Sequence, residues 1–258
     1  MILAVDIGNT TIVLGGFEAD KLCFVARLST DNPKTEDEFA VSMLQALSLH
    51  GISREDVKGV IVSSVVPPLN AAIKKAIRFA FGKEPIFVGP GIKSGIGIQC
   101  DMPSSVGADI IAASVAAHYI YGSPSLIIDM GTATKMTVVN GKGCFIGTSI
   151  IPGVHMGLNA LAERTAQLPK ISLEAPGAVI GKNTADCMRS GVLYGNASMI
   201  DGMIDRINDE FGEPLKAYAT GGLASLIIPL CKHDICIDEH LVLKGLNILY
   251  TKNKNNVL

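Results

Sequence analysis

Tryptophan is absent from this sequence, and aromatic residues of all kinds make up only 5% of its 258 residues. Because single-stranded nucleic acid is held largely by stacking its bases on aromatic rings, a base-binding surface is not expected. The net charge of −2 gives neither nucleic acid nor an anionic membrane an electrostatic reason to bind. No apolar run reaches the ~20 residues that a membrane-spanning helix needs. We therefore predict a protein without a nucleic-acid or membrane partner.

The cysteine and histidine patterns of zinc sites are also missing. The six cysteines form no CxxC pair, and the five histidines show neither HxxxH nor HxH spacing. Scattered cysteines, in a chain that opens on a strand pattern rather than a signal-peptide pattern, favour a cytoplasmic protein with reduced thiols. What the chain does have is a high apolar content, 48%, which is enough for a large core.

One pattern occurs twice. Residues 3–11 read LAVDIGNTT, and residues 126–134 read LIIDMGTAT. Each copy predicts a buried strand, a tight glycine turn and a second strand, with Asp6 or Asp129 at the end of the first strand. Grouped backbone N–H donors in such a turn can hold phosphate oxygens, and glycine lets a bulky group approach closely. Two copies indicate a duplicated fold in which two loops face one ligand.

The rest of the sequence repeats one order of elements, βββαβαβα, in each half. The first half has strands near 2–7, 11–17, 21–28, 60–65 and 85–88, and helices that end near 50, 81 and 121. The second half has strands near 125–130, 134–139, 143–151, 217–219 and 235–237, and helices near 152–164, 184–211 and 240–250. This order predicts an α/β protein of two halves, 1–116 and 117–258, with its ligand in the inter-domain cleft.

Each candidate site has a plain structural alternative. Asp6 and Asp129 could each make only an Asx turn, but the repetition favours carboxylates that position Mg²⁺ beside phosphates. Gly221 and Gly222 follow a predicted strand and could be only a tight connection; beside the two Asp-x-Gly turns they favour a flat surface for adenosine.

Asp109 and Thr184 lie at the starts of predicted helices. An acidic residue in the first helical turn is common because it interacts favourably with the helix dipole. The functional alternative makes Asp109 a general base that accepts the proton of an attacking hydroxyl. Thr184 by its position alone could be a helix N-cap.

Together, these motifs resemble those of type III pantothenate kinases, from the first strand to about residue 250. The residues that carry the resemblance are Asp6-x-Gly8-Asn9-Thr10, Gly107-Ala108-Asp109, Asp129-x-Gly131-Thr132-Ala133-Thr134, Pro152-Gly153, Gly181-Lys182-Asn183-Thr184 and Thr220-Gly221-Gly222. The resemblance implies the ribonuclease-H-like halves of the actin, heat-shock ATPase and sugar kinase superfamily. It also implies ATP-dependent phosphorylation of pantothenate, the first step of coenzyme A synthesis.

The resemblance assigns roles to particular residues. ATP would contact Asp6, Gly8, Asn9, Thr10, Gly131, Thr132, Gly221 and Gly222. Asp109 would accept the proton, and pantothenate would lie against Cys100, Gly107, Ala108, Ile110 and Thr184. Asp6 would hold Mg²⁺ through water, and Asp129 would bind a monovalent cation, K⁺ or NH₄⁺. The implied assembly is a homodimer with its sites at the interface, where Thr184 acts on the other subunit's substrate.

Four positions depart from the family pattern. Ile110 replaces an arginine, Cys100 a tyrosine, Met102 an asparagine and Lys135 a threonine. Loss of the arginine removes a charge-assisted hydrogen bond to the pantothenate carboxylate, which is worth roughly 1.5–3 kcal/mol. Two alternatives therefore stay open: a paralogous kinase for another small alcohol, or a catalytically weak ATP- or ligand-binding regulatory protein. Lys135 could supply a replacement positive charge, but the sequence alone does not place it in the pocket.

Overall fold

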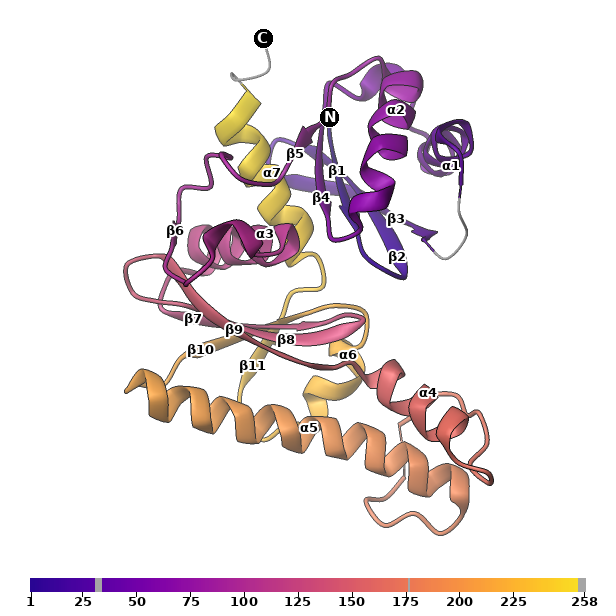
Figure 1. Ribbon diagram of the computed structural model, residues 1–258, viewed down its shortest axis with the longest axis vertical. Helices are drawn as coiled ribbons and strands as arrows, with labels where there is room; N and C mark the ends of the chain where they lie inside the picture. Colours follow the sequence, from indigo (N-terminus) through magenta and orange to yellow (C-terminus); the bar gives the residue numbers. More distant parts are fainter. Residues whose placement is uncertain (31–33, 176, 255–258) are drawn as a thin grey trace. The chain divides into compact units, whose positions relative to one another are not determined.

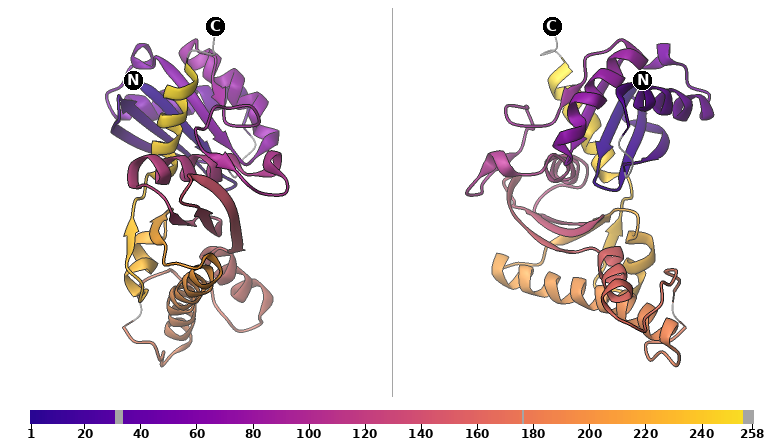
Figure 2. Two further views of the ribbon diagram at one scale, coloured as in Figure 1. Left: turned by 90° about the vertical axis from the view of Figure 1, so that its left-hand side faces the viewer. Right: turned by 45° about the vertical axis from the view of Figure 1, so that its right-hand side comes forward.

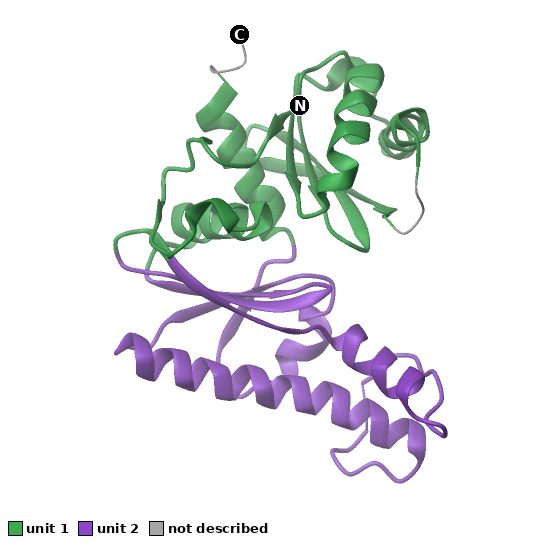
Figure 3. Ribbon diagram, viewed as in Figure 1, with its two compact units in different colours: residues 1–123, 142–145, 240–258 green, residues 124–141, 146–239 purple. Residues whose placement is uncertain are grey.

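A computed structural model describes residues 1–30, 34–175 and 177–254. The chain divides into two compact units (Figure 3). Unit 1 comprises residues 1–123, 142–145 and 240–258, and unit 2 comprises residues 124–141 and 146–239. The predicted boundary lay at 116/117 and assigned the last helix to the second half, whereas this helix packs in unit 1. Among the described residues, no helix has both the length and the apolar character to cross a membrane.

Unit 1 is built on a five-stranded sheet of order β3-β2-β1-β4-β5 (Figure 1). Its strands are β1 (Ile2–Ile7), β2 (Thr11–Glu18), β3 (Lys21–Ser29), β4 (Gly59–Ser64) and β5 (Ile86–Phe87). The first three strands are antiparallel neighbours, while β4 runs parallel to β1. These strands agree with the predicted ones to within two residues at each end, because their apolar runs and glycine turns are local signals.

Helices cover both faces of this sheet. Alternate residues of β1 explain why: Leu3, Val5 and Ile7 join one core cluster, and Ala4 joins another. The first cluster includes side chains of α1 (Glu36–Leu49) and α2 (Asn70–Phe81). The second includes side chains of α3 (Ala108–Ala116) and α7 (Leu241–Asn253). The start of α1 is fixed by a capping box, in which the Thr35 hydroxyl accepts from the Glu38 N–H and the Glu38 carboxylate accepts from the Thr35 N–H.

Three details of unit 1 differ from the prediction. The helix expected to end near residue 121 is α-helical only to Ala116 and continues as a π turn over Ala117–Tyr121. No strand was predicted between the strand at 85–88 and the helix that ends near 121, but this stretch includes β6 (Gly97–Ile98), which pairs with residues 144–145. The last helix continues to Asn253, because the buried Asn253 amide exchanges two 3.0 Å hydrogen bonds with the Lys93 backbone.

Unit 2 contains strands in the order β11-β10-β7-β8-β9. They are β7 (Ser125–Met130), β8 (Ala133–Val139), β9 (Cys144–Pro152), β10 (Lys216–Thr220) and β11 (Ile235–Ile237). The first two residues of β9 belong to unit 1. The helices are α4 (Val154–Arg164), α5 (Thr184–Phe211) and α6 (Ala224–Ile227). The 28-residue α5 runs along one face of this sheet, as Figures 1 and 2 show, and its Leu193 and Ile200 share a core cluster with Leu126 and Ile128 of β7.

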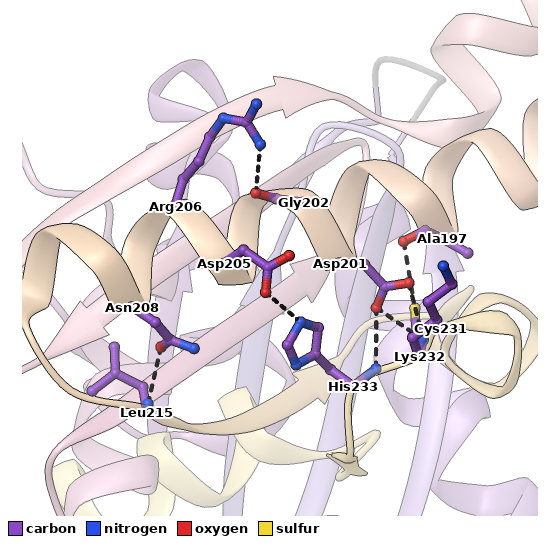
Figure 4. A network of polar contacts seen from close by, with 10 residues as sticks. All are labelled: Ala197, Asp201, Gly202, Asp205, Arg206, Asn208, Leu215, Cys231, Lys232 and His233. Carbon is purple, nitrogen blue, oxygen red and sulfur yellow. Dashed lines mark hydrogen bonds and ion pairs between the residues drawn. The ribbon is translucent and has the colours of Figure 1, made fainter.

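A polar network joins α5 to the segment before β11 (Figure 4). The largely buried Asp201 carboxylate accepts hydrogen bonds from the backbone N–H groups of Lys232 at 2.9 Å and His233 at 3.2 Å. Burial, with a smaller contribution from Asp201, raises the pKa of the neighbouring Cys231 thiol to about 12. Nearer the solvent, Asp205 Oδ1 lies 2.9 Å from His233 Nε2. Asp201 therefore serves as a structural acceptor for a turn that no local sequence pattern indicates.

We expect Asp201→Ala to lower the free energy of unfolding by about 3 kcal/mol, since a charged acceptor of two backbone donors is lost. Asp205→Ala is the matched control. Its carboxylate is 65% exposed, so this change should lower stability by less than about 1 kcal/mol. Urea unfolding followed by circular dichroism measures both. Equal losses would show that Asp201 does not hold the turn.

Candidate active site

The first Asp-x-Gly turn joins β1 to β2 in unit 1. Asp6 lies on β1 opposite Ser63 of the parallel strand β4, close to the carboxyl end of both strands. The Gly8 N–H donates to the Thr11 carbonyl at 3.0 Å and closes the turn. Asn9 is exposed at the tip. The turn therefore presents backbone N–H groups and short polar side chains at the end of the sheet.

Thr30 anchors this turn, and the sequence analysis missed it. Its N–H donates to the Thr10 carbonyl at 3.0 Å, and its hydroxyl donates to the Gly8 carbonyl at 3.0 Å. Thr30 directly follows β3, whose last residue, Ser29, pairs with Thr11. The pairing register of β2 and β3 could have identified Thr30. In that register Ser29 lies opposite Thr11, so the next residue, Thr30, lies beside the first turn.

Asp109 lies in the first turn of α3, also in unit 1. Its Oδ1 accepts a 2.8 Å hydrogen bond from the Ile110 backbone N–H, so the carboxylate turns over the helix start. Gly107 is the N-cap and contributes no side-chain cap. The side chains of Ala108 and Ile110 are buried, at 7% and 9% exposure. Asp109 thus has the half-exposed position that a proton acceptor requires, while Ile110 supplies no polar group.

Cys100 and Met102 precede this helix. The Cys100 side chain is half-buried, whereas Met102 is 67% exposed. Both side chains lack a charge, so neither offers an ionic partner to a carboxylate, and Ile110 does not provide one either.

The second Asp-x-Gly turn joins β7 to β8 in unit 2. Gly131 and Thr132 are exposed at its tip. The start of α4 packs directly against it: a Cβ added at Gly153 would lie 2.1 Å from the Thr132 carbonyl oxygen. Only glycine at the N-cap lets the helix begin so close to the loop. The sequence predicted a helix that begins near Pro152-Gly153, but it did not predict this contact.

The glycine pair after β10 lies beside the same turn. Thr220 of β10 pairs with Asp129 of β7. Gly221 has a φ of +96°, and a Cβ added there would lie 2.5 Å from the Met130 carbonyl oxygen. Gly222 is exposed, with open space where a side chain would be. Unit 2 therefore brings the Asp129 strand end, the Thr132 loop and the glycine pair together.

Asp129 has an ionic partner that the sequence did not place. Lys135 Nζ lies 2.7 Å from Asp129 Oδ2, and the two side chains are only 16% and 17% exposed. They face each other because Asp129 and Lys135 are directly paired across β7 and β8. A positive charge is thus built into the second turn.

Thr184 is the first residue of α5 and is exposed. The plain alternative that it caps this helix is wrong, because Asn183 is the cap: its Oδ1 accepts from the Asp186 N–H at 3.0 Å. Thr184 belongs to unit 2 together with Gly131, Thr132 and Gly221. Asp6, Cys100 and Asp109 belong to unit 1.

In the part of the chain that the structure describes, no group of three or more His, Cys, Asp or Glu side chains could hold a metal ion. A dedicated all-protein metal cage is therefore not found there. Mg²⁺ commonly uses one or two carboxylates together with the phosphates of a substrate. Asp6, at the first turn, has the chemistry for that role.

Solved structures support the fold. A protein from Campylobacter jejuni, described as a conserved Baf family transcriptional activator, is 19% identical, with 98% of this chain and 99% of that chain covered and a TM-score of 0.62. A 2-dehydro-3-deoxygalactonokinase protein from Sinorhizobium meliloti is 14% identical, with 96% and 95% covered and a TM-score of 0.61. An N-acetylmannosamine kinase from Listeria monocytogenes is 13% identical, with 98% and 99% covered and a TM-score of 0.53. At these identities the likeness supports the duplicated actin-like α/β fold alone.

The profile of the type III pantothenate kinase family matches residues 2–206. The match spans the two Asp-x-Gly turns, the start of α3, the loop against α4 and the start of α5. This chain therefore belongs to the type III pantothenate kinase family, enzymes that use ATP to phosphorylate pantothenate in coenzyme A synthesis.

Proposed function

We propose that this chain transfers the γ-phosphate of ATP to the primary hydroxyl of pantothenate with the residue roles given below. The observation that carries the proposal is the pair of Asp-x-Gly turns. Each is closed or packed by backbone contacts, at Gly8 in one unit and at Gly153 and Gly221 in the other. Preorganised N–H donors of this kind stabilise phosphate charge without having to reorganise during the reaction.

The nucleotide contacts follow from the turns. Backbone and side-chain donors of Asn9 and Thr10, and of Gly131 and Thr132, hold the triphosphate. Gly8, whose N–H closes the first turn, lets the phosphates approach the backbone closely. Adenosine lies against Gly221 and Gly222, where the exposed Gly222 has no side chain to obstruct a flat ring. Asp6 is the carboxylate that would hold Mg²⁺ through water. Mg²⁺ bound there supplies charge neutralisation at the phosphates.

Asp109 accepts the proton of the attacking hydroxyl. Its Oδ1 is held by the Ile110 N–H, which orients the carboxylate before substrate arrives. Phosphoryl transfer then depends mainly on positioning and electrostatics. Pantothenate contacts the backbone of Gly107 and Ala108, the Cys100 and Ile110 region, and Thr184 from a second subunit.

The monovalent cation that the resemblance implies does not fit easily at Asp129. The Asp129 carboxylate already pairs with the Lys135 ammonium at 2.7 Å. K⁺ or NH₄⁺ would have to share that carboxylate with a fixed positive charge. No step of the proposed mechanism therefore runs through a monovalent ion.

We propose a homodimer that works in the cytoplasm, where ATP is available. Exposed large apolar side chains on unit 2 support self-association, since such groups gain by leaving water. They occur at the end of β9, on α4 and just before α5: Ile150, Met156, Leu161, Val179 and Ile180. Sedimentation velocity tests this: a dimer is expected, which the charged double variant Met156→Glu with Ile180→Glu should dissociate. A wild-type monomer at assay concentration would overturn it.

A coupled ADP-release assay with pantothenate and a panel of related alcohols tests the proposed acceptor. Turnover on pantothenate is expected, with a high Michaelis constant because Ile110 offers no hydrogen-bond donor from its side chain. Turnover restricted to an alcohol without a carboxylate would favour the paralogous kinase. Tight ATP binding without turnover on any alcohol would favour the regulatory protein.

The buried position of Ile110 bears on which group binds the carboxylate of the acceptor. At 9% exposure, its side chain packs into the protein rather than lining an open polar surface. We propose that the pantothenate carboxylate is recognised by backbone N–H groups at the start of α3 or by a residue of the second subunit. The alcohol panel measures this directly through the difference between pantothenate and its carboxylate-free analogues.

A further inference from the structure

The strongest unexplained feature of the second turn is its internal ion pair. Asp129 and Lys135 occupy directly paired positions on β7 and β8. Neighbouring residues of β8, Thr134 and Met136, are fully buried, and Met136 belongs to the core cluster of the α5 side. Because side chains alternate along a strand, Lys135 projects from the other face of the sheet. Its ammonium therefore lies near the start of β8, and Lys135 is three residues after the exposed Thr132.

The geometry gives this pair more weight than an ordinary surface ion pair. The Nζ–Oδ2 distance is 2.7 Å, and the side chains are only 16% and 17% exposed. Partial burial weakens the screening by water and salt that makes exposed pairs nearly neutral in energy. The Lys135 ammonium belongs to the chain itself and is held by the Asp129 carboxylate, so placing it there needs no ion from solution.

An unpaired carboxylate here would oppose ATP binding. Asp129 lies two residues before Gly131, and its negative charge would repel a triphosphate held by the turn of Gly131 and Thr132. Some cation therefore has to accompany Asp129. An alkylammonium carries the same single positive charge as K⁺ or NH₄⁺, and it already occupies one carboxylate oxygen.

We propose that the Lys135 ammonium is the built-in monovalent cation of this enzyme, so that ATP binding and turnover need neither K⁺ nor NH₄⁺. The inference rests on the proposed role of the second turn in holding the triphosphate. It makes the threonine-to-lysine departure at position 135 a functional change rather than a neutral one. It also implies that a variant with an uncharged residue at position 135 would need K⁺ or NH₄⁺ from solution for ATP binding.

The first test compares wild-type protein in potassium chloride and in tetramethylammonium chloride at equal ionic strength. ATP binding is measured by isothermal titration calorimetry, and ADP release is measured with pantothenate. We expect both to change by less than about twofold, since the fixed ammonium already supplies the charge. ATP binding that needs K⁺ in the wild type would overturn the proposal.

The second test uses Lys135→Thr, which removes the charge and adds an oxygen that can ligate a metal ion. In tetramethylammonium its ATP affinity should fall about tenfold or more, because a charge-assisted interaction is lost. K⁺ should restore most of that affinity. Lys135→Met, which adds no oxygen, should lose the affinity and be restored less by K⁺. Equal ATP affinity of Lys135→Thr and wild type in tetramethylammonium would contradict the inference.

Lys75→Thr is the matched control. Lys75 also pairs with a carboxylate, Glu36 at 3.2 Å, but on an exposed surface of unit 1. This variant should keep wild-type affinity in both salts. If Lys135→Thr does not fold, as judged by circular dichroism, the wild-type comparison alone decides. Because ATP binding is measured without an acceptor, a failure of pantothenate turnover would count against the proposed function and leave this inference separately tested.

Discussion

Asp109→Asn should lower kcat by about 10²- to 10⁴-fold, the usual contribution of a positioned general base. Asparagine keeps the oxygen that accepts the Ile110 N–H at 2.8 Å, so the start of α3 should be preserved. It cannot, however, take up the proton of the pantothenate hydroxyl. The change therefore removes the proton acceptor with little effect on local structure.

Single-turnover and steady-state ADP release measure the loss, and calorimetric ATP titration provides the second readout. We expect the ATP dissociation constant to stay within about threefold of wild type, because the role proposed for Asp109 is on the acceptor in the transition state and not on the bound nucleotide. Asp20→Asn, an exposed acid in unit 1 outside the proposed site, controls for the charge change. Activity of Asp109→Asn within a few-fold of wild type would remove Asp109 from the mechanism.

Gly221→Ala should both disrupt the part of the proposed nucleotide site that lies on unit 2 and destabilise the fold. The backbone at Gly221 has a φ of +96°, and an added Cβ would lie 2.5 Å from the Met130 carbonyl oxygen. A left-handed conformation costs an L-residue roughly 1–2 kcal/mol, and overpacking a tight contact typically adds about 1–3 kcal/mol. Since Met130 directly precedes the Gly131 turn, the displacement passes to the phosphate-binding loop.

Gly222→Ala separates stability from binding. Its added Cβ would meet nothing within 4 Å, so thermal unfolding should remain close to wild type. If adenosine lies against Gly222, this variant should weaken ATP binding without lowering stability, whereas Gly221→Ala should lower both. Unchanged stability of Gly221→Ala in a thermal melt would be incompatible with the close packing at Met130.

The two predictions address different parts of the reaction. Asp109 belongs to unit 1 and has the proposed role of proton acceptor, while Gly221 belongs to unit 2 and has a proposed place in the nucleotide site. Asp109→Asn should lose turnover but keep ATP binding, whereas Gly221→Ala should lose ATP binding. This pair of results would support a catalytic role for the first residue and a nucleotide-binding role for the second.

Much of the fold was available from the sequence. The strands β1, β2, β7 and β8 and the long helix α5 were predicted to within about two residues, because hydrophobic periodicity and glycine turns are local. The duplicated Asp-x-Gly pattern also indicated two anion-binding loops. The family match over residues 2–206 confirms the family that the motifs resemble, while the binding role of the two loops stays a prediction.

Contacts between distant residues were not available in the same way. The helix α7 packs within unit 1 through Leu243, Leu246 and Leu249. These side chains contact residues of β1, β4 and α3, which are far away in the sequence. Likewise, Asp201 accepts from backbone groups more than thirty positions later. Neither leaves a local pattern, since an amphipathic helix or a helical aspartate is compatible with many partners.

The second Asp-x-Gly turn also shows which features are local in the sequence and which depend on tertiary contacts. The sequence alone determined that Asp129 ends a strand before a glycine turn and that a lysine replaces threonine at 135. Only the tertiary structure decided that the Lys135 ammonium lies 2.7 Å from that carboxylate and that both are mostly buried. The reason is physical: residue identity and turn chemistry are local properties, whereas the strength of a charge pair depends on register, distance and exclusion of water, which the packed sheet sets.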